Sequence, residues 1–209
     1  MGAKDSSMNA RCLSRVIANG PTRSQNGRVP AFAWLASMSA ISLSTLTGVL
    51  NRRFFDETLL AECKHGQAAN GIFSLIIFDL DHFKKVNDQY GHANGDQALR
   101  LIAEVFRENI RAFDSLARYG GEEFVVVMPG SNPEDATAAA ERLRMAVETV
   151  VFEPYPGQRH KLSVSVGVSC TSDEVSTPEQ LLHTADLALY EAKHGGRNRV
   201  ELAPLLSVG

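Results

Sequence analysis

The segment Phe73-Ser-Leu-Ile-Ile-Phe78 is a nearly continuous apolar run, and Asp79-Leu-Asp81 follows it directly. An uninterrupted run of this kind is typical of a strand that other elements cover on both faces. We therefore predict that residues 73–78 form a central strand of a sheet. A carboxylate at the C-terminal end of such a strand lies at the sheet edge, where ligands commonly bind. Taken alone, Asp79-Leu-Asp81 could equally cap a following helix.

The chain on both sides of this strand alternates between helical and extended patterns. Apolar residues at three-and-four spacing predict a long amphipathic helix, and alternation with period two predicts half-buried strands. The expected elements are helices at 54–64, 83–90, 95–112, 133–150 and 178–193, and strands at 73–78, 115–119, 122–128, 162–168 and 199–202. This order predicts an α+β fold, an α/β sandwich in which helices pack on a sheet.

A second acidic pair, Glu122-Glu123, follows Gly120-Gly121 between two predicted strands. Gly-Gly between extended runs indicates a hairpin, and successive strand residues point to opposite faces. The glycines also permit a bulky ligand to approach the backbone closely. One interpretation is a ligand site in which one of the two carboxylates binds a metal. The other interpretation is an ordinary surface turn that carries two acidic residues.

The two acidic segments together are stronger evidence for a metal site than either one alone. If the strand that ends at Asp79 lies beside the strand that begins at Glu122, their carboxylates meet at one sheet edge. Oxygen ligands favour magnesium or manganese, and such an ion neutralises phosphate charge. Lys193 and Arg197, at the end of the last predicted helix, are the basic groups that a triphosphate would need. The alternative for those two is a solvated helix end.

The composition sets limits on the protein's class. A length of 209 residues is enough for one domain with a core and an additional segment. The net charge of −3 gives no general attraction to nucleic acid or anionic lipid, so nucleic acid is not an expected partner. Cys12, Cys63 and Cys170 have neither disulfide-like nor zinc-like spacing, which fits a reducing cytosol.

Residues 1–42 differ in character from the remainder. We expect a partly disordered arm with a linker helix, because Ser, Asn, Gly and Arg dominate the first part and small apolar residues follow over 31–41. No charged residue lies between Arg28 and Arg52, so a membrane anchor is one alternative. Pro30 and several Ser and Thr residues favour an amphipathic or partner-packing helix instead.

Five segments together resemble the signature blocks of GGDEF-family diguanylate cyclases. They are Leu46-Thr-Gly-Val-Leu-Asn-Arg-Arg53, Asp79-Leu-Asp-His-Phe-Lys-Lys-Val-Asn-Asp88, Gly91-His-Ala-Asn-Gly-Asp96, Arg118-Tyr-Gly-Gly-Glu-Glu-Phe124 and Ala192-Lys-His-Gly-Gly-Arg-Asn198. A lone Gly-Gly-Glu-Glu-Phe would be weak evidence, whereas the ordered set is specific. The resemblance implies a cyclase domain over 43–202, a tail over 203–209, and a mostly antiparallel central sheet of the palm-like nucleotidyl cyclase type.

The resemblance also implies an activity and a role for individual residues. The activity is condensation of two GTP molecules into cyclic di-GMP and two pyrophosphates. Mg²⁺ or Mn²⁺ would be bound by Asp79, the Leu80 carbonyl and Glu122, and Glu123 would assist or accept the 3′-hydroxyl proton. The substrate contacts would be Asn87 and Asp96 at the guanine edge, backbone N–H groups around Phe83 and Lys84 at the phosphates, and Lys193 and Arg197 at the terminal phosphates.

A regulatory pattern matches the family as well. Arg111-Ala-Phe-Asp114 precedes Gly120 at the spacing of the family's Arg-x-x-Asp product-inhibition site. Arg can contact guanine O6 and N7, and a carboxylate can accept from guanine N1 and N2. Arg142, on the next predicted helix, would add a phosphate contact. The alternative is an ordinary ion pair at a helix end. Ser44 replaces the usual Asp two residues before Leu46, which concerns regulation and not the metal site.

The resemblance finally implies partners and a location. Two GTP-loaded domains must face each other, which implies a homodimer in the bacterial cytoplasm, with cyclic di-GMP as product and inhibitor. A membrane tether through the N-terminal region is the alternative for location. The alternative for function is a non-catalytic module that binds GTP or cyclic di-GMP and signals through a partner. The complete set of carboxylates and basic residues favours the cyclase.

Overall fold

The computed structural model describes residues 43–69 and 71–204. The arm and linker helix expected over residues 1–42 lie outside these ranges, as does most of the expected tail. Among the described residues, no helix is both long enough and apolar enough to cross a membrane.

A six-stranded sheet forms the centre of the described chain. Its strands are β1 Leu50–Asn51, β2 Phe73–Leu80, β3 Ser115–Arg118, β4 Glu123–Pro129, β7 Val164–Cys170 and β8 Val200–Leu202. Their spatial order is β1-β3-β4-β2-β7-β8. The pairings β3–β4, β4–β2 and β2–β7 are antiparallel, and the two outer pairings are parallel. The predicted α+β fold with a mostly antiparallel sheet is confirmed.

The strand predicted to be central is the middle of this sheet. All eight residues of β2 are buried, and β4 and β7 flank it on its two sides. The structure extends it two residues beyond the predicted end at Phe78, so that Asp79 is part of the strand. Asp79 therefore has a position fixed by ladder hydrogen bonds rather than by a loop.

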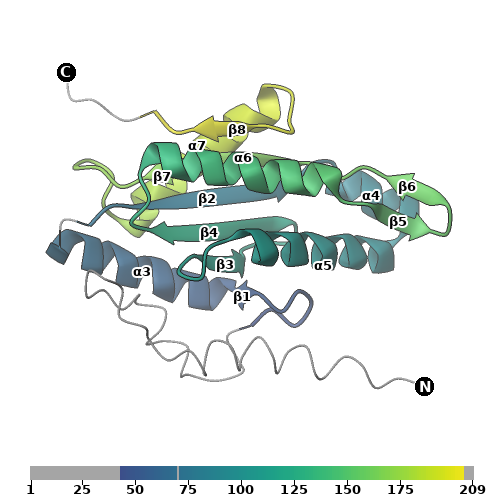
Figure 1. The fold of residues 1–209 in the computed structure, drawn as a ribbon, viewed down its shortest axis with the longest axis horizontal. Coiled ribbons are helices and arrows are strands. Elements are labelled where there is room, and N and C mark those ends of the chain that lie inside the picture. Colours follow the sequence, from purple (N-terminus) through teal and green to yellow (C-terminus); the bar gives the residue numbers. More distant parts are fainter. Residues whose placement is uncertain (1–42, 70, 205–209) are drawn as a thin grey trace. The chain divides into compact units, whose positions relative to one another are not determined.

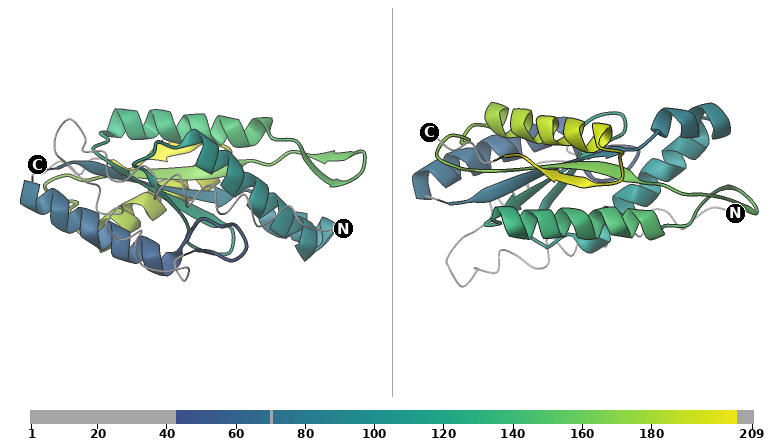
Figure 2. Two further views of the ribbon diagram at one scale, coloured as in Figure 1. Left: turned by 60° about the horizontal axis from the view of Figure 1, so that its bottom comes forward. Right: turned by 90° about the horizontal axis from the view of Figure 1, so that it is seen from above.

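Two layers of helices cover the sheet (Figures 1 and 2). The helices are α3 Arg52–Ala69, α4 Phe83–Tyr90, α5 His92–Asn109, α6 Pro133–Thr149 and α7 Pro178–His194. One core cluster joins α4, α5 and α6 to the sheet face that contains Ile76 and Phe78. The other joins α3 and α7 to the face that contains Leu75 and Ile77. The alternation of side chains along β2 thus supplies apolar contacts to both layers.

Three helices have bounds within one residue of the prediction, and two of them begin with a side-chain cap. α4 spans the expected residues 83–90, and α6 has Pro133 in its first turn with the Asn132 side chain as its N-cap. In α7, Thr177 and Gln180 form a capping box before the predicted start at Pro178. These local signals explain why the helix boundaries could be predicted closely.

Two helix predictions were wrong in their bounds. The helix expected at 54–64 runs from Arg52 to Ala69. The helix expected at 95–112 begins at His92 and ends at Asn109, because Ile110 is extended and the Asp114 side chain accepts a hydrogen bond from the Arg111 N–H. The Asp114 carboxylate therefore stabilises a turn where the apolar spacing alone predicted another helical turn.

A small hairpin was missed by the sequence prediction. β5 Phe152–Tyr155 and β6 Gln158–His160 pair with each other apart from the main sheet. Pro154 and Pro156 lie in this segment, and proline cannot donate a ladder hydrogen bond, which argued against strands. Tyr155 Oη donates to the Tyr90 carbonyl at 3.3 Å, so the hairpin packs against the end of α4 (Figure 1).

Candidate active site

The register of β2 against β4 brings the predicted acidic residues together. Asp79 lies opposite Glu123 across the antiparallel ladder. The Leu80 N–H donates to the Glu122 carbonyl oxygen at 3.3 Å, which joins the strand end to the hairpin. The expected convergence of these segments at one sheet edge is confirmed. We call Asp79, Glu122 and Glu123 the carboxylate edge.

A basic residue from the last helix reaches this edge. Lys193 is in the final turn of α7, and its Nζ lies 2.8 Å from Asp79 Oδ2. Asp79 is only 7% exposed, whereas 33% of the Lys193 side chain is exposed, so the pair is shielded from water on the Asp79 side. Arg197 follows in the loop after α7 and is itself exposed. The structure therefore brings one predicted phosphate-binding cation into direct contact with one predicted metal ligand, Asp79.

The carboxylate edge carries an excess of negative charge. Burial raises the pKa of Asp79, and the Lys193 ammonium opposes that shift. Burial also raises the pKa of Glu122 and of Glu123, and the Asp79 charge adds to the increase in both. These three carboxylates outnumber the nearby cations Lys193 and Arg197, and like charges disfavour one another's ionised form. An additional cation would lower the free energy of the ionised edge.

The donor set fits a hard divalent cation that also binds phosphate. Among residues 43–69 and 71–204, no group of three or more His, Cys, Asp or Glu side chains is already arranged around a metal position. Mg²⁺ commonly uses one or two carboxylates and completes its coordination with substrate phosphate and water, so a preformed cluster is not required. The Glu123 carboxylate lies against Gly120, where any side chain would overlap it. The absence of a side chain at Gly120 therefore makes room for the Glu123 carboxylate.

The predicted guanine contacts lie on the two helices that follow β2. Asn87 is in α4 and Asp96 is in the first part of α5. The Asn87 side-chain oxygen lies so close to Gly95 that any side chain at Gly95 would overlap it. Burial lowers the pKa of Arg118, and the nearby Asp96 carboxylate partly offsets that change. Asp96 thus lies near the end of β3.

The start of α4 offers free backbone donors. His82, the residue before the helix, has a left-handed conformation with φ of 58°. In the described part of the chain, the Phe83 and Lys84 N–H groups have no acceptor, because the first hydrogen bond to the His82 carbonyl comes from Lys85. Unpaired N–H groups at a helix N-terminus attract anions. This geometry agrees with the predicted phosphate contact.

The predicted inhibitory residues meet at the end of α5. Asp114 is 8% exposed, and its Oδ2 accepts from the Arg111 N–H at 2.9 Å. Burial raises the pKa of Asp114, and the Arg111 N–H and the charges of Arg111 and Arg142 oppose the increase. Arg142 on α6 also donates to the Asn109 carbonyl at 3.3 Å. We call Arg111, Asp114 and Arg142 the arginine turn.

Sequence reasoning gave no role to Asp81 beyond a possible helix cap. Its carboxylate accepts from Ser163 Oγ at 2.7 Å, Ser165 Oγ at 2.6 Å and the Asn198 N–H at 3.0 Å. The interpretation of Asp81 as a cap for the following helix is wrong, since α4 has no side-chain cap. The acidic residue two positions after Asp79 was the visible signal, but its partners are more than 80 residues away in sequence.

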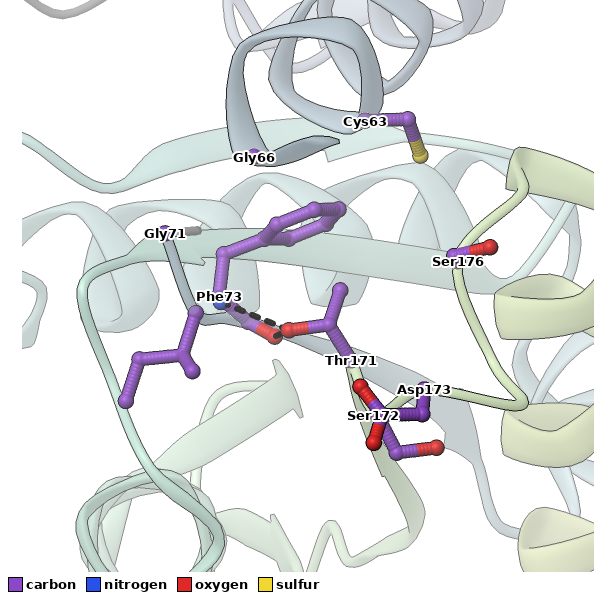
Figure 3. Close-up of a pocket in the computed structure, with 9 residues that line it drawn as sticks. Cys63, Gly66, Gly71, Phe73, Thr171, Ser172, Asp173 and Ser176 are labelled. Atoms are coloured by element: carbon purple, nitrogen blue, oxygen red, sulfur yellow. Dashed lines mark hydrogen bonds between the residues drawn. The ribbon is translucent and has the colours of Figure 1, made fainter. Parts of the chain in front are cut away.

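A cavity lies at the opposite end of β2 from the carboxylate edge. It has a volume of about 390 Å³ and is lined by residues that include Cys63, Phe73, Thr171 and Ser172 (Figure 3). The Phe73 N–H donates to Thr171 Oγ1 at 3.0 Å across its floor. Burial raises the pKa of Cys63 to about 11, which leaves the thiol protonated and unreactive at neutral pH. None of the predicted site residues lines this cavity.

Comparison with known proteins identifies the family of the chain. The family model described as "Diguanylate cyclase, GGDEF domain" matches residues 42–199. Response regulator PleD of Caulobacter vibrioides is 44% identical over 156 residues, which cover 74% of this chain and 34% of PleD. Diguanylate cyclase DosC of Escherichia coli is 37% identical over 166 residues, which cover 79% of this chain and 36% of DosC. The chain therefore spans about a third of the length of these relatives.

A solved structure supports the fold. The GGDEF domain of DgcB from Caulobacter crescentus, crystallised in complex with c-di-GMP, superposes with a TM-score of 0.76 at 31% identity. The match covers 79% of this chain and 98% of that domain. The mixed sheet and its surrounding helices thus match those of a solved GGDEF domain.

Proposed function

The chain belongs to the GGDEF diguanylate cyclase family, and on that premise we propose that it condenses two GTP molecules into cyclic di-GMP and two pyrophosphates. The catalytic domain would span residues 43–202. The observation that carries the proposal is the carboxylate edge, where Asp79 pairs in register with Glu123 and contacts Lys193 at 2.8 Å. Acidic metal ligands beside a phosphate-binding cation are what nucleotidyl transfer requires.

Asp79, the Leu80 carbonyl and Glu122 would hold Mg²⁺ or Mn²⁺, with Glu123 assisting. When bound, such an ion neutralises phosphate charge and favours deprotonation of a nearby hydroxyl. Alternatively, Glu123 would be the base that accepts the 3′-hydroxyl proton, since it lies opposite Asp79 at the same sheet edge.

The remaining residues would bind and orient the nucleotide. Asn87 and Asp96 would read the guanine edge, and the Phe83 and Lys84 N–H groups would bind phosphate oxygens. Lys193 and Arg197 would bind the terminal phosphates and stabilise the departing pyrophosphate. Because these groups are fixed charges and dipoles around the reacting phosphate, their contribution to catalysis would be mainly electrostatic.

Each domain would hold one GTP, so that product formation requires two domains whose 3′-hydroxyls attack each other's α-phosphates. A monomer would bind GTP without releasing cyclic di-GMP. The product would also bind the arginine turn and hold domains where the two GTP sites cannot meet. Inhibition of this kind couples two distinct sites and would be non-competitive with GTP. The protein would act in the bacterial cytoplasm.

The direct test is to incubate the purified protein with GTP and Mg²⁺ and to identify the product by mass. We expect cyclic di-GMP and pyrophosphate, and we expect the reaction to stop when a chelator removes the metal and to resume when Mg²⁺ is restored. GTP binding without product at protein concentrations where a dimer is present would instead support a non-catalytic module.

Guanine selection provides a second test. If Asn87 and Asp96 read the base, GTP should be turned over at least about 100-fold faster than ATP, because adenine would leave buried polar groups unpaired. Asn87→Ala should reduce this ratio. Asp88→Ala, which changes the adjacent exposed residue of α4, should leave it unchanged. Equal turnover of both nucleotides by the wild-type protein would mean that the base is bound elsewhere.

A further inference from the structure

The loop after α7 has a backbone that its own sequence does not favour. Arg197 and Asn198 have φ values of 66° and 46°, and neither is glycine. Consecutive left-handed conformations are disfavoured for residues with side chains and persist only where surrounding contacts hold them. Contacts that hold this loop therefore also determine where Arg197 lies.

Asn198 is the residue through which the loop is held. Its N–H donates to Asp81 Oδ2 at 3.0 Å, and its side-chain oxygen accepts from Arg144 Nη1 at 2.7 Å. Its side-chain nitrogen donates to Glu148 Oε1 at 3.3 Å. Asn198 thus connects the end of β2 to α6. We call Asp81, Arg144 and Asn198 the Asn198 clamp.

The two outer members of the clamp are themselves fixed. Asp81 accepts hydrogen bonds from Ser163 and Ser165 at the start of β7. The Arg144 side chain is 12% exposed and donates to both oxygens of Glu141, at 2.7 and 2.9 Å. Arg144 also donates to Glu148 at 2.9 Å. Groups with this many partners offer Asn198 a rigid attachment on each side.

Arg197 has no comparable support of its own. Its N–H donates to the Ala192 carbonyl at 3.0 Å, but in residues 43–69 and 71–204 its guanidinium has no hydrogen-bond or ion-pair partner. Arg197 follows Lys193 by four residues, and the Lys193 Nζ lies 2.8 Å from Asp79 Oδ2, so the loop of Arg197 begins beside the carboxylate edge. The direction of this side chain depends on its backbone, and the backbone depends on its neighbour Asn198.

We propose that the Asn198 clamp positions Arg197 for the terminal phosphate of the nucleotide. The inference rests on the proposed function, because it takes GTP as the ligand of Arg197. Asp81, Arg144 and Asn198 are positioning residues that act through Arg197. A purely structural clamp would stabilise the loop but would have no particular effect on recognition of the third phosphate.

The test is a double-mutant cycle read out by nucleotide affinity. 3′-Deoxy-GTP and 3′-deoxy-GDP lack the attacking hydroxyl, so their binding can be measured by calorimetry without turnover. Loss of one charge-assisted contact corresponds to about a tenfold change in affinity. We expect Arg197→Ala to reduce the preference for the triphosphate about tenfold, and Arg144→Gln and Asn198→Gly to reduce it several-fold. Glycine tolerates the left-handed backbone, so Asn198→Gly removes the side-chain contacts without adding strain.

The decisive variant combines Arg144→Gln with Arg197→Ala. If the clamp acts through Arg197, the double variant should show the same preference as Arg197→Ala alone. Arg53→Gln is the matched control, since it also breaks an i,i+4 ion pair with a glutamate, on the exposed surface of α3. It should leave the preference unchanged.

Several results would overturn the inference. One is that Arg144→Gln reduces the preference for the triphosphate by the same factor in the Arg197→Ala variant as in the wild-type protein. Another is equal weakening of both nucleotides, or unfolding of both clamp variants in thermal melts, since either would mean that the contacts serve stability alone. Failure of the wild-type protein to convert GTP, with the binding cycle intact, would reject the proposed function and leave the positioning role standing.

Discussion

The carboxylate edge and the arginine turn are each built around one buried aspartate, yet they have opposite electrostatic demands. Asp79 and Asp114 are exposed to nearly the same small extent, 7% and 8%, and burial raises the pKa of both. Around Asp79 lie Glu122 and Glu123, which are further carboxylates. Around Asp114 lie two arginines, Arg111 and Arg142. The three carboxylates of the first region outnumber its cations, Lys193 and Arg197, whereas the second region has one cation more than its aspartate neutralises.

This difference indicates which ligand each region can accept. A region with surplus carboxylates gains stability from a metal ion and from the cationic side chains that accompany it. A region with surplus arginine charge gains stability from phosphate or from the acceptor edge of guanine. The same buried residue type can therefore serve a metal-dependent catalytic site and an anion-binding regulatory site. The neighbouring side chains determine whether a cation or an anion is needed to balance the charge of each region.

The largest expected effect is loss of turnover when the carboxylate edge is broken. Asp79→Ala and Glu122→Ala should each reduce cyclic di-GMP formation by about 100-fold or more, a barrier change of ~2.7 kcal/mol, because each removes a metal ligand. Product would be quantified by chromatography in excess Mg²⁺. Cyclic di-GMP binding at the arginine turn should persist in both variants.

The control for these variants is Asp88→Ala, which removes an exposed carboxylate from α4 and should leave turnover unchanged. If Asp79→Ala or Glu122→Ala retained more than about a tenth of the activity, a loss under ~1.4 kcal/mol, the assignment of the metal ligands would be wrong.

A smaller effect is expected at the arginine turn. Arg111→Ala should remove bidentate contacts worth about 1–3 kcal/mol, so the inhibition constant for cyclic di-GMP should rise about tenfold or more. Turnover should barely change when product is removed continuously. The measurement is an initial-rate titration with added cyclic di-GMP. Identical inhibition curves for wild type and variant would show that Arg111 and Asp114 only stabilise a turn.

The smallest effect concerns the pH dependence of stability. Because the pKa of Asp114 is raised by folding, the native state binds its proton more tightly, and that stabilisation is lost as pH rises from 3.8 through the folded-state value. Asp114→Asn removes this loss while its amide oxygen can still accept from the Arg111 N–H. The variant should therefore gain stability relative to wild type as pH rises to neutrality, by no more than about 1 kcal/mol.

Urea denaturation at several pH values would measure the difference between the two proteins. A relative gain by the wild-type protein as pH rises would mean that the arginines outweigh the burial of Asp114. In that case the pKa of this carboxyl would be lowered and not raised, and the arginine turn would have less positive charge available for a ligand.

Much of the fold and of the carboxylate edge could be predicted because the signals are local. The apolar run of β2 identified a strand buried on both faces, and Gly120-Gly121 identified the hairpin that returns beside it. Antiparallel pairing then placed Asp79 against Glu123. The starts of α6 and α7 depend on Asn132 and Thr177, whose cap hydrogen bonds operate within one turn.

What could not be predicted depends on contacts between distant residues. The bonds from Ser163, Ser165 and Asn198 to Asp81 leave no pattern in any one stretch of sequence. The early end of α5 likewise depends on a side chain, Asp114, that competes with helix continuation. Apolar periodicity contains no information about this competition. The short β5–β6 hairpin was not predicted because the prolines in that segment argued against strands.

The burial of β2 has a consequence for how long different parts of the site keep their shape. A strand with all eight residues buried and partners on both sides exchanges its amide hydrogens only when the sheet opens as a whole. Asp79 therefore keeps its position for the lifetime of the folded state. The loop of Arg197 is held by the few hydrogen bonds of the Asn198 clamp, so under the proposed function its local opening would release pyrophosphate while the proposed metal ligands stay in place.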